Sequence, residues 1–93
     1  MHDLLLAKDV LAETLAQAQK LKLKKISKVF VLLGHIEESH ASHNHHSVHE
    51  ITPANLKFNF NLLKKGTAAG DARLVIEHWH QTGWCLKNIY GTK

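Results

Sequence analysis

The chain has 93 residues, of which 44% are hydrophobic and 22% charged, so it can bury one modest core as a single domain. The formal net charge of +4 favours solubility rather than nucleic-acid binding, and it fits either an ordinary solvated basic surface or an acidic partner. Because Cys85 is the one cysteine, an internal disulfide framework and a four-thiolate zinc site within the chain are excluded. No apolar run approaches the roughly 20 residues of a membrane-spanning helix, and none resembles a signal peptide, so we expect a cytoplasmic protein.

The first third of the chain is predicted to form a helix and then a strand. Apolar residues spaced by seven, four and three positions predict a helix over residues 4–22, with Asp3 as its N-cap. Residues 26–33 alternate as a strand with two partly apolar faces. The alternation allows two interpretations of Phe30 and Leu32: an exposed patch for a partner, or a face covered by the fold.

The second half is predicted to form a helix and two strands. Thr52 and Pro53 are typical of a helix start, and Gly66 is the expected C-cap. Residues 72–80 and 84–90 are predicted strands joined by a tight turn as an antiparallel hairpin. The order helix–strand–helix–strand–strand predicts an α+β fold in which two helices pack on one face of a small, mostly antiparallel three-stranded sheet.

Nine histidines are the most unusual feature of the composition, and six of them fall within a polar segment, residues 34–50, predicted to be a long loop. These six are His35, His40, His43, His45, His46 and His49. Imidazole is the commonest ligand of transition metals, and such spacings on a flexible chain permit several exchangeable sites rather than one rigid cage. Nickel, zinc and copper would compete for these sites. The alternative is a solvated polar loop or a pH-sensitive surface.

Two further histidines, His78 and His80, flank Trp79 in a predicted strand, so both imidazoles are expected on one face. They could form a secondary metal site, or they could be ordinary polar groups of an edge strand. Cys85 lies between apolar residues in the next strand, which favours a buried and unreactive thiol.

The amino terminus, Met1-His2-Asp3, has the chemistry of a metal chelate. The α-amine, the backbone nitrogen of His2 and its imidazole can close small rings around one ion, and Asp3 can supply a fourth donor. Such nearly planar, nitrogen-rich coordination suits Ni(II) or Cu(II), whereas zinc prefers a tetrahedron. The alternative is an ordinary exposed terminal histidine.

Several segments together resemble the HypA/HybF family of hydrogenase nickel-incorporation proteins. They cover most of residues 1–34 and 51–78 and include Met1-His2-Asp3-Leu4, Ile26-Ser27-Lys28-Val29 and Ile51-Thr52-Pro53-Ala54-Asn55-Leu56. The resemblance implies a domain with two helices over a three-stranded sheet. It also implies nickel bound at the amino terminus, with His2 as principal ligand and Asp3 assisting. It further implies transfer of nickel to a GTPase partner for hydrogenase, or sometimes urease, assembly.

The chain departs from the family pattern at two places. The family inserts a zinc module with two Cys-x-x-Cys pairs between its last two strands, where this chain has His80-Gln81-Thr82-Gly83. Structural zinc held by four cysteines is therefore not expected. The segment after the first strand is normally short, whereas here it holds the histidine-rich insertion.

These features predict one nickel-binding domain over residues 1–93 with a histidine-rich loop at 34–50. The expected function is that of a metallochaperone for the maturation of hydrogenase or urease, or a protein for nickel capture and storage. The expected partner is a maturation GTPase or a metalloenzyme precursor, and a homo-oligomer is a further option. The sequence contains no enzymatic motif, so an enzyme is not expected. The alternative is a protein–protein docking module that keeps the family fold without delivering metal.

Overall fold

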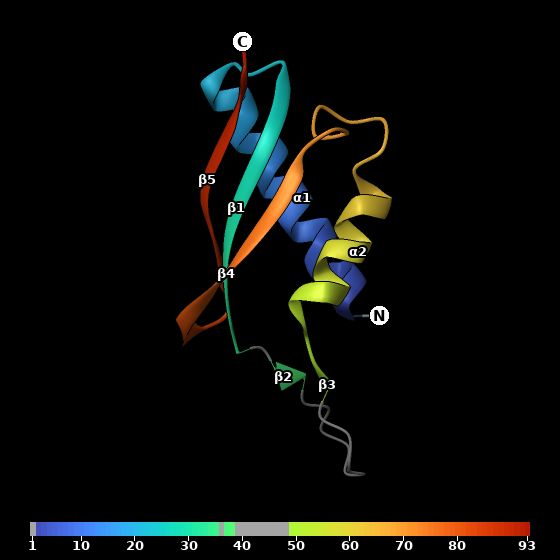
Figure 1. Cartoon of the computed structure of the whole chain (residues 1–93), viewed down its shortest axis with the longest axis vertical. Helices are drawn as coiled ribbons and strands as arrows, with labels where there is room; N and C mark the ends of the chain where they lie inside the picture. The colour runs from blue at the N-terminus through green and yellow to red at the C-terminus, as the bar shows by residue number, and fades with distance from the viewer. Residues whose placement is uncertain (1, 36, 39–48) are drawn as a thin grey trace.

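A computed structural model describes residues 2–35, 37–38 and 49–93 of the chain (Figure 1). In chain order the elements are α1 (His2–Leu21), β1 (Lys25–His35), β2 (Glu37–Glu38), β3 (His49–Glu50), α2 (Pro53–Leu63), β4 (Arg73–Thr82) and β5 (Trp84–Thr92). The predicted α+β fold is confirmed, with two helices and a three-stranded sheet in the expected order. The structure adds a short antiparallel pair, β2–β3, which the sequence analysis assigned to an irregular loop.

The main sheet has the strand order β4-β1-β5, so β1 occupies the centre. β1 runs parallel to β4 and antiparallel to β5. The predicted direct hairpin between the last two strands is therefore wrong, because β1 lies between them. The physical reason is that β1 is apolar on both faces, which favours a central position over an edge.

The connection from β4 to β5 passes around the end of β1. The backbone N–H of Gly34 donates to the carbonyl oxygen of Gly83 at 2.8 Å, and that of Gly83 donates to the carbonyl oxygen of His35 at 3.4 Å. A Cβ atom on Gly34 would collide with the carbonyl oxygen of Gln81, so the close crossing requires glycine there. Gly83 makes the reversal at φ 94°, a conformation that other residues rarely adopt.

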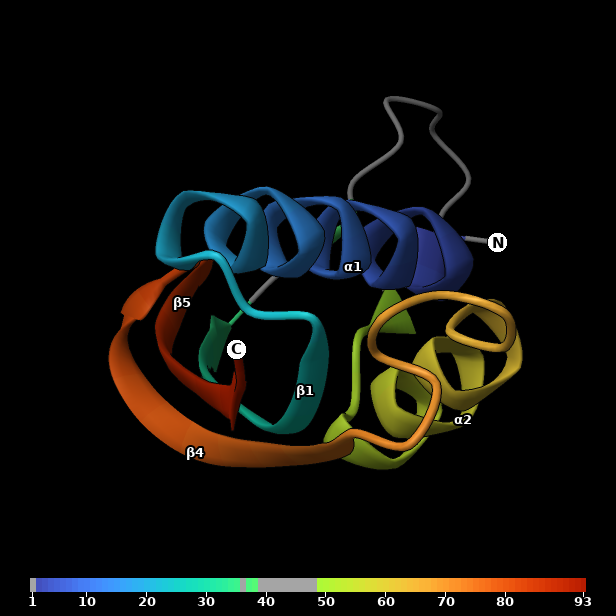
Figure 2. The same cartoon turned by 90° about the horizontal axis from the view of Figure 1, so that it is seen from above.

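The core lies between the sheet and α1, which covers one face of the sheet (Figure 2). α2 packs mainly against α1 and touches β4 more lightly. The largest fully buried side chains include Phe60 and Leu56 of α2, Val10 of α1, and Val29 and Val31 of β1. The core thus joins both helices to the central strand.

The start of α1 differs from the predicted start, and the helix ends in a cap formed by a lysine. α1 begins at His2, so Asp3 lies inside the helix and is not the N-cap. At the other end, the N–H of Leu23 donates to the carbonyl oxygen of Ala18 at 2.8 Å, and Lys22 adopts φ 60°. This is a Schellman-type cap, in which a left-handed residue redirects the chain into β1.

α2 begins where the sequence predicted. The Thr52 hydroxyl accepts a hydrogen bond from the N–H of Asn55 at 3.2 Å, which confirms the N-cap. Its end is earlier than predicted: the C-cap is Lys64, whose N–H donates to the carbonyl oxygen of Phe60 at 2.9 Å, and Gly66 lies beyond it at φ 81°. Glycine therefore shapes the loop after the helix rather than its cap.

Candidate functional site

The primary site predicted from the sequence lies at the beginning of α1, beside α2 (Figures 1 and 2). The structure places the backbone of His2 and Asp3 in the first turn of the helix, while Met1 lies outside the described residues. The first four N–H groups of a helix have no acceptor within it. The backbone nitrogen of His2 can therefore serve as a metal donor without breaking a hydrogen bond of α1.

A second group of predicted residues meets at the end of the main sheet. His35 of β1 and His78 of β4 line one pocket, because the two strands run parallel and Leu33 pairs with His78. The remaining walls are mostly apolar and come from Leu33, Gly34, Ile51, Pro53, Ile76 and Glu77. That His35 and His78 line the same pocket was not predicted, because it depends on the parallel pairing of β1 with β4.

The secondary metal site at His78 and His80 stays a prediction. Both side chains are exposed, but His78 lines the pocket and His80 is not among its lining residues. Within residues 2–35, 37–38 and 49–93, no group of three or more His, Cys, Asp or Glu side chains is arranged to hold a metal ion. Among the described residues, His35 and His78 are the two histidines that line this pocket.

Most of the predicted loop ligands lie outside the described residues. These are His40, His43, His45 and His46. The backbone of His49 is described and pairs with Glu38 in the β2–β3 ribbon, next to the pairing of Glu37 with Glu50. The β2–β3 pair therefore flanks residues 39–48 on both sides. β1 ends at His35, just before β2, and His35 lines the pocket.

Cys85 differs from its predicted environment. The thiol is exposed, and Cys85 pairs with Leu32 of β1 on the side of the sheet away from α1. The bulge between Phe30 and Val31 shifts the register of β5, so that Leu86 rather than Lys87 pairs with buried Val31, and Cys85 pairs with Leu32 rather than with buried Leu33. A single-residue shift moves a side chain to the other face of a sheet, which the alternation of β5 alone does not reveal.

The fold is that of a small α+β domain, and its nine histidines are residues of the type that bind transition metals. A comparison with protein families then identifies the particular family. The sequence pattern of HypA, described as a hydrogenase/urease nickel incorporation metallochaperone, matches residues 1–90, and the chain belongs to that family. A search of curated proteins finds no match.

Family membership sets the general function. The HypA family incorporates nickel into hydrogenase or urease, so its members act as metallochaperones with nickel as cargo and work with the proteins of metalloenzyme maturation. Of the described helices, none is long and apolar enough to cross a membrane.

Proposed function

We propose that this chain carries Ni(II) at its amino terminus, through the α-amine of Met1, the backbone nitrogen and imidazole of His2, and Asp3. The observation that carries the proposal is the family match, which begins at residue 1 and so includes these three residues. The position of His2 as the first residue of α1 supports it, because its backbone nitrogen is not used inside the helix. The nickel is cargo, destined for a maturation GTPase or a metalloenzyme precursor.

The electrostatics of a helix start favour reversible binding at this place. The amino-terminal end of a helix carries a partial positive charge that disfavours a cation by about 0.3–1 kcal/mol. The carboxylate of Asp3 offsets this repulsion because it brings a negative charge to the first turn. A site balanced in this way can hold nickel and still release it to a partner with a more complete ligand set.

The test is a calorimetric titration of Ni(II) and Zn(II) into metal-free protein whose first residue is Met1. A matched protein with two extra residues before Met1 keeps every side chain but removes the terminal amine from the chelate. We expect one tight, nickel-preferring site in the first protein and its loss in the second. Equal tight binding by both proteins would show that the amine is not a ligand and would reject the terminal chelate.

We further propose that the histidine-rich segment is a secondary nickel store. The spacing of its imidazoles supports this, because several sets of two to four donors can exchange one ion. In a variant with His40, His43, His45 and His46 replaced by asparagine, we expect the weaker sites to disappear from the titration while the tight site remains. The free energy of unfolding of the metal-free protein should change by less than about 0.5 kcal/mol. Retention of all the weaker sites would contradict the storage role.

A further inference from the structure

None of the described helices lies over the face of the main sheet turned away from α1 (Figure 2). The inward positions are identified by their burial: Val29, Val31 and Leu33 of β1, with Leu74 and Ile89, belong to the core. Neighbouring positions on a strand point to opposite faces. The outer sheet face therefore includes Lys28, Phe30 and Leu32 of β1, Arg73, Val75 and Glu77 of β4, and Tyr90 of β5.

The centre of the outer sheet face is apolar, which is unusual for a face open to water. Phe30 pairs with Val75 of β4, and both side chains are half-buried. The ring of Phe30 contacts that of Tyr90 edge to face, with centroids 5.6 Å apart and an interplanar angle of 85°, while Tyr90 stays 51% exposed. A sheet face that only meets water normally carries polar residues at such positions. Rigid aromatic side chains of this kind are common anchors of protein interfaces.

Positive charge lies at one end of this apolar centre. Lys28 pairs directly with Arg73 across β1 and β4, and like charges in direct opposition destabilise a sheet. The acidic side chains nearby already have lysine partners: Asp71 lies 3.4 Å from Lys25. Among the described residues, no ion pair is formed by either Lys28 or Arg73.

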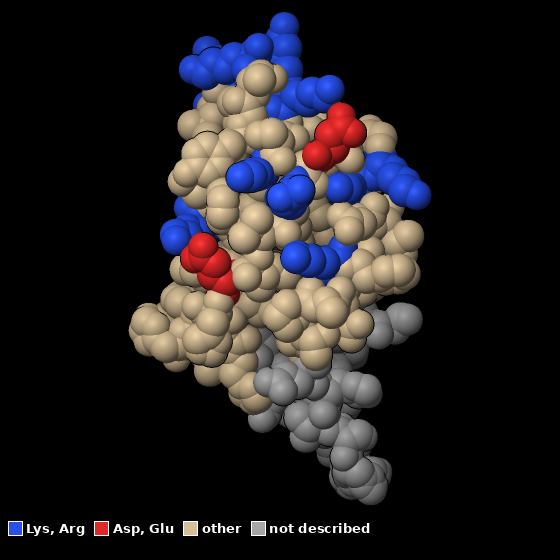
Figure 3. Space-filling model, in the orientation of Figure 1, with Lys and Arg blue, Asp and Glu red and all other residues tan. Residues whose placement is uncertain are grey.

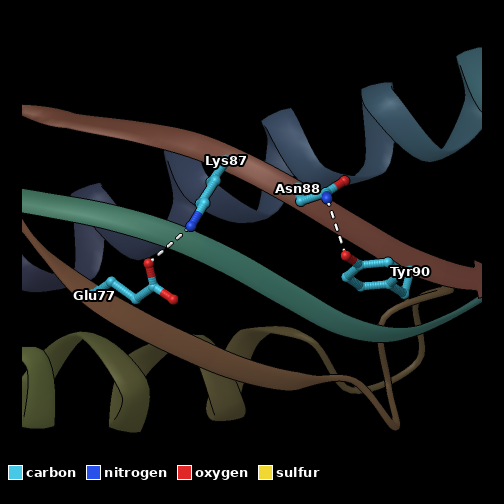
Figure 4. Close-up of polar contacts among 4 residues, drawn as sticks. All are labelled: Glu77, Lys87, Asn88 and Tyr90. Atoms are coloured by element: carbon cyan, nitrogen blue, oxygen red, sulfur yellow. Dashed lines mark hydrogen bonds and ion pairs between the residues drawn. The ribbon is translucent and has the colours of Figure 1, made fainter.

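The second lysine–acid pair crosses the sheet. The Nζ of Lys87 on β5 lies 3.0 Å from the Oε1 of Glu77 on β4, so the pair spans the central strand (Figure 4). Glu77 pairs with Leu32, which places this bridge over the apolar centre. It leaves the opposite end of the face, at Lys28 and Arg73, as the uncompensated positive end.

The positive charge continues from the sheet onto α2. Arg73 lines a shallow hollow together with Lys57 of α2 and Lys64 at its C-cap, with Asn61 and Asp71 also in its wall. Figure 3 views the molecule from this side, and blue lysine and arginine groups outnumber the red acidic groups across the strands and α2. An apolar centre with a positive margin is complementary to a partner surface with an apolar centre and a negative margin.

We propose that the outer sheet face docks an acidic surface of the protein that receives the nickel. This role of the partner rests on the proposed function, whereas the location of the surface rests on the sheet itself. Three strands of about six residues cover roughly 300 Å². That area is well below the ~800 Å² per partner of a stable interface and suits the brief contact of a handover. The acidic groups on the face and its apolar centre fit a protein better than a phosphate backbone.

The test compares two double variants with the same change in net charge. Lys28→Glu with Arg73→Glu reverses the outer sheet face, and Lys8→Glu with Lys20→Glu reverses two exposed lysines of α1. Dissociation constants are measured for the purified maturation GTPase and the metalloenzyme precursor of the same organism, at low and high salt. For at least one of these proteins we expect the first variant to bind at least ten-fold more weakly, with a smaller salt dependence. The α1 variant should stay within about two-fold of the wild type.

A neutral double variant tests whether a loss of partner binding results from a loss of folding. Lys28→Gln with Arg73→Gln removes the like-charge pair, so its melting temperature should equal or exceed that of the wild type while partner binding still weakens. Equal losses in both charge-reversal variants, no loss in either, or no binding of either protein by the wild type would overturn the proposal. So would binding of a single-stranded RNA of about 20 nucleotides that is lost in the same variants while protein binding is kept. Nickel titration of each variant separates these results from a failure of the metal site, since the outer sheet face is not part of the amino-terminal chelate.

Discussion

Replacing Phe60 by alanine is expected to lower the free energy of unfolding by about 3–5 kcal/mol, the usual loss for a fully buried phenylalanine. Phe60 is completely buried in α2, where it belongs to the core shared with α1 and β1. Small domains are stable by only about 5–15 kcal/mol, so this change removes a large part of the total. Unfolding in urea, followed by far-ultraviolet circular dichroism, measures the loss.

The same helix supplies a matched control for this prediction. Phe58 lies two residues before Phe60, and its side chain is 63% exposed. Phe58→Ala removes the same atoms from a solvent-facing position and should change the stability by no more than about 0.5 kcal/mol. Similar effects of the two substitutions would mean that α2 does not pack against α1 through the face described above.

Local features of the fold were predictable from the sequence because local chemistry decides them. The hydroxyl of Thr52 caps α2 as expected, since the cap depends on a backbone N–H only three residues away. Alternation likewise placed the three strands of the main sheet to within two residues of their bounds. The ends of helices were less predictable: Asp3 lies inside α1, and Gly66 lies beyond the cap of α2. Neighbouring residue types favour a cap but do not fix it.

Pairing of distant strands was not predictable in the same way. A tight turn with Gly83 is typical of a hairpin, yet β1 lies between the strands on either side of it. The useful signal was the apolar character of both faces of β1, which indicates a central strand. Phe30 and Leu32 are half-buried on a face that no described helix covers, so this face is neither a fully exposed patch nor fully covered by the fold.

The candidate site residues also differ in whether local sequence or distant pairing determines their arrangement. Met1, His2 and Asp3 are adjacent in sequence, so their chelate could be proposed from the sequence alone. The pocket shared by His35 and His78 depends on the register between β1 and β4, and neither periodicity nor spacing determines that register. The outer sheet face was likewise not predictable from the sequence, because Lys28 and Arg73 are paired only in the folded sheet.

Substituting His2 by alanine is expected to weaken the tight binding of nickel by about 100-fold or more. Loss of a residue that merely supports a metal ligand costs about 10–100-fold in affinity, and His2 would supply the ligand itself. Alanine is a good helix former, so α1 should persist, with a change in unfolding free energy below about 0.5 kcal/mol. Calorimetry and competition with a chromophoric chelator measure the affinity of metal-free protein that begins at Met1. His78→Ala is the matched control, because it removes an imidazole from the pocket of His35 but not from the terminal chelate, and it should keep the tight site. If the histidine at position 2 is dispensable and His78 is not, the cargo site is the pocket at the end of the sheet, and nickel reaches a partner from there rather than from the first turn of α1.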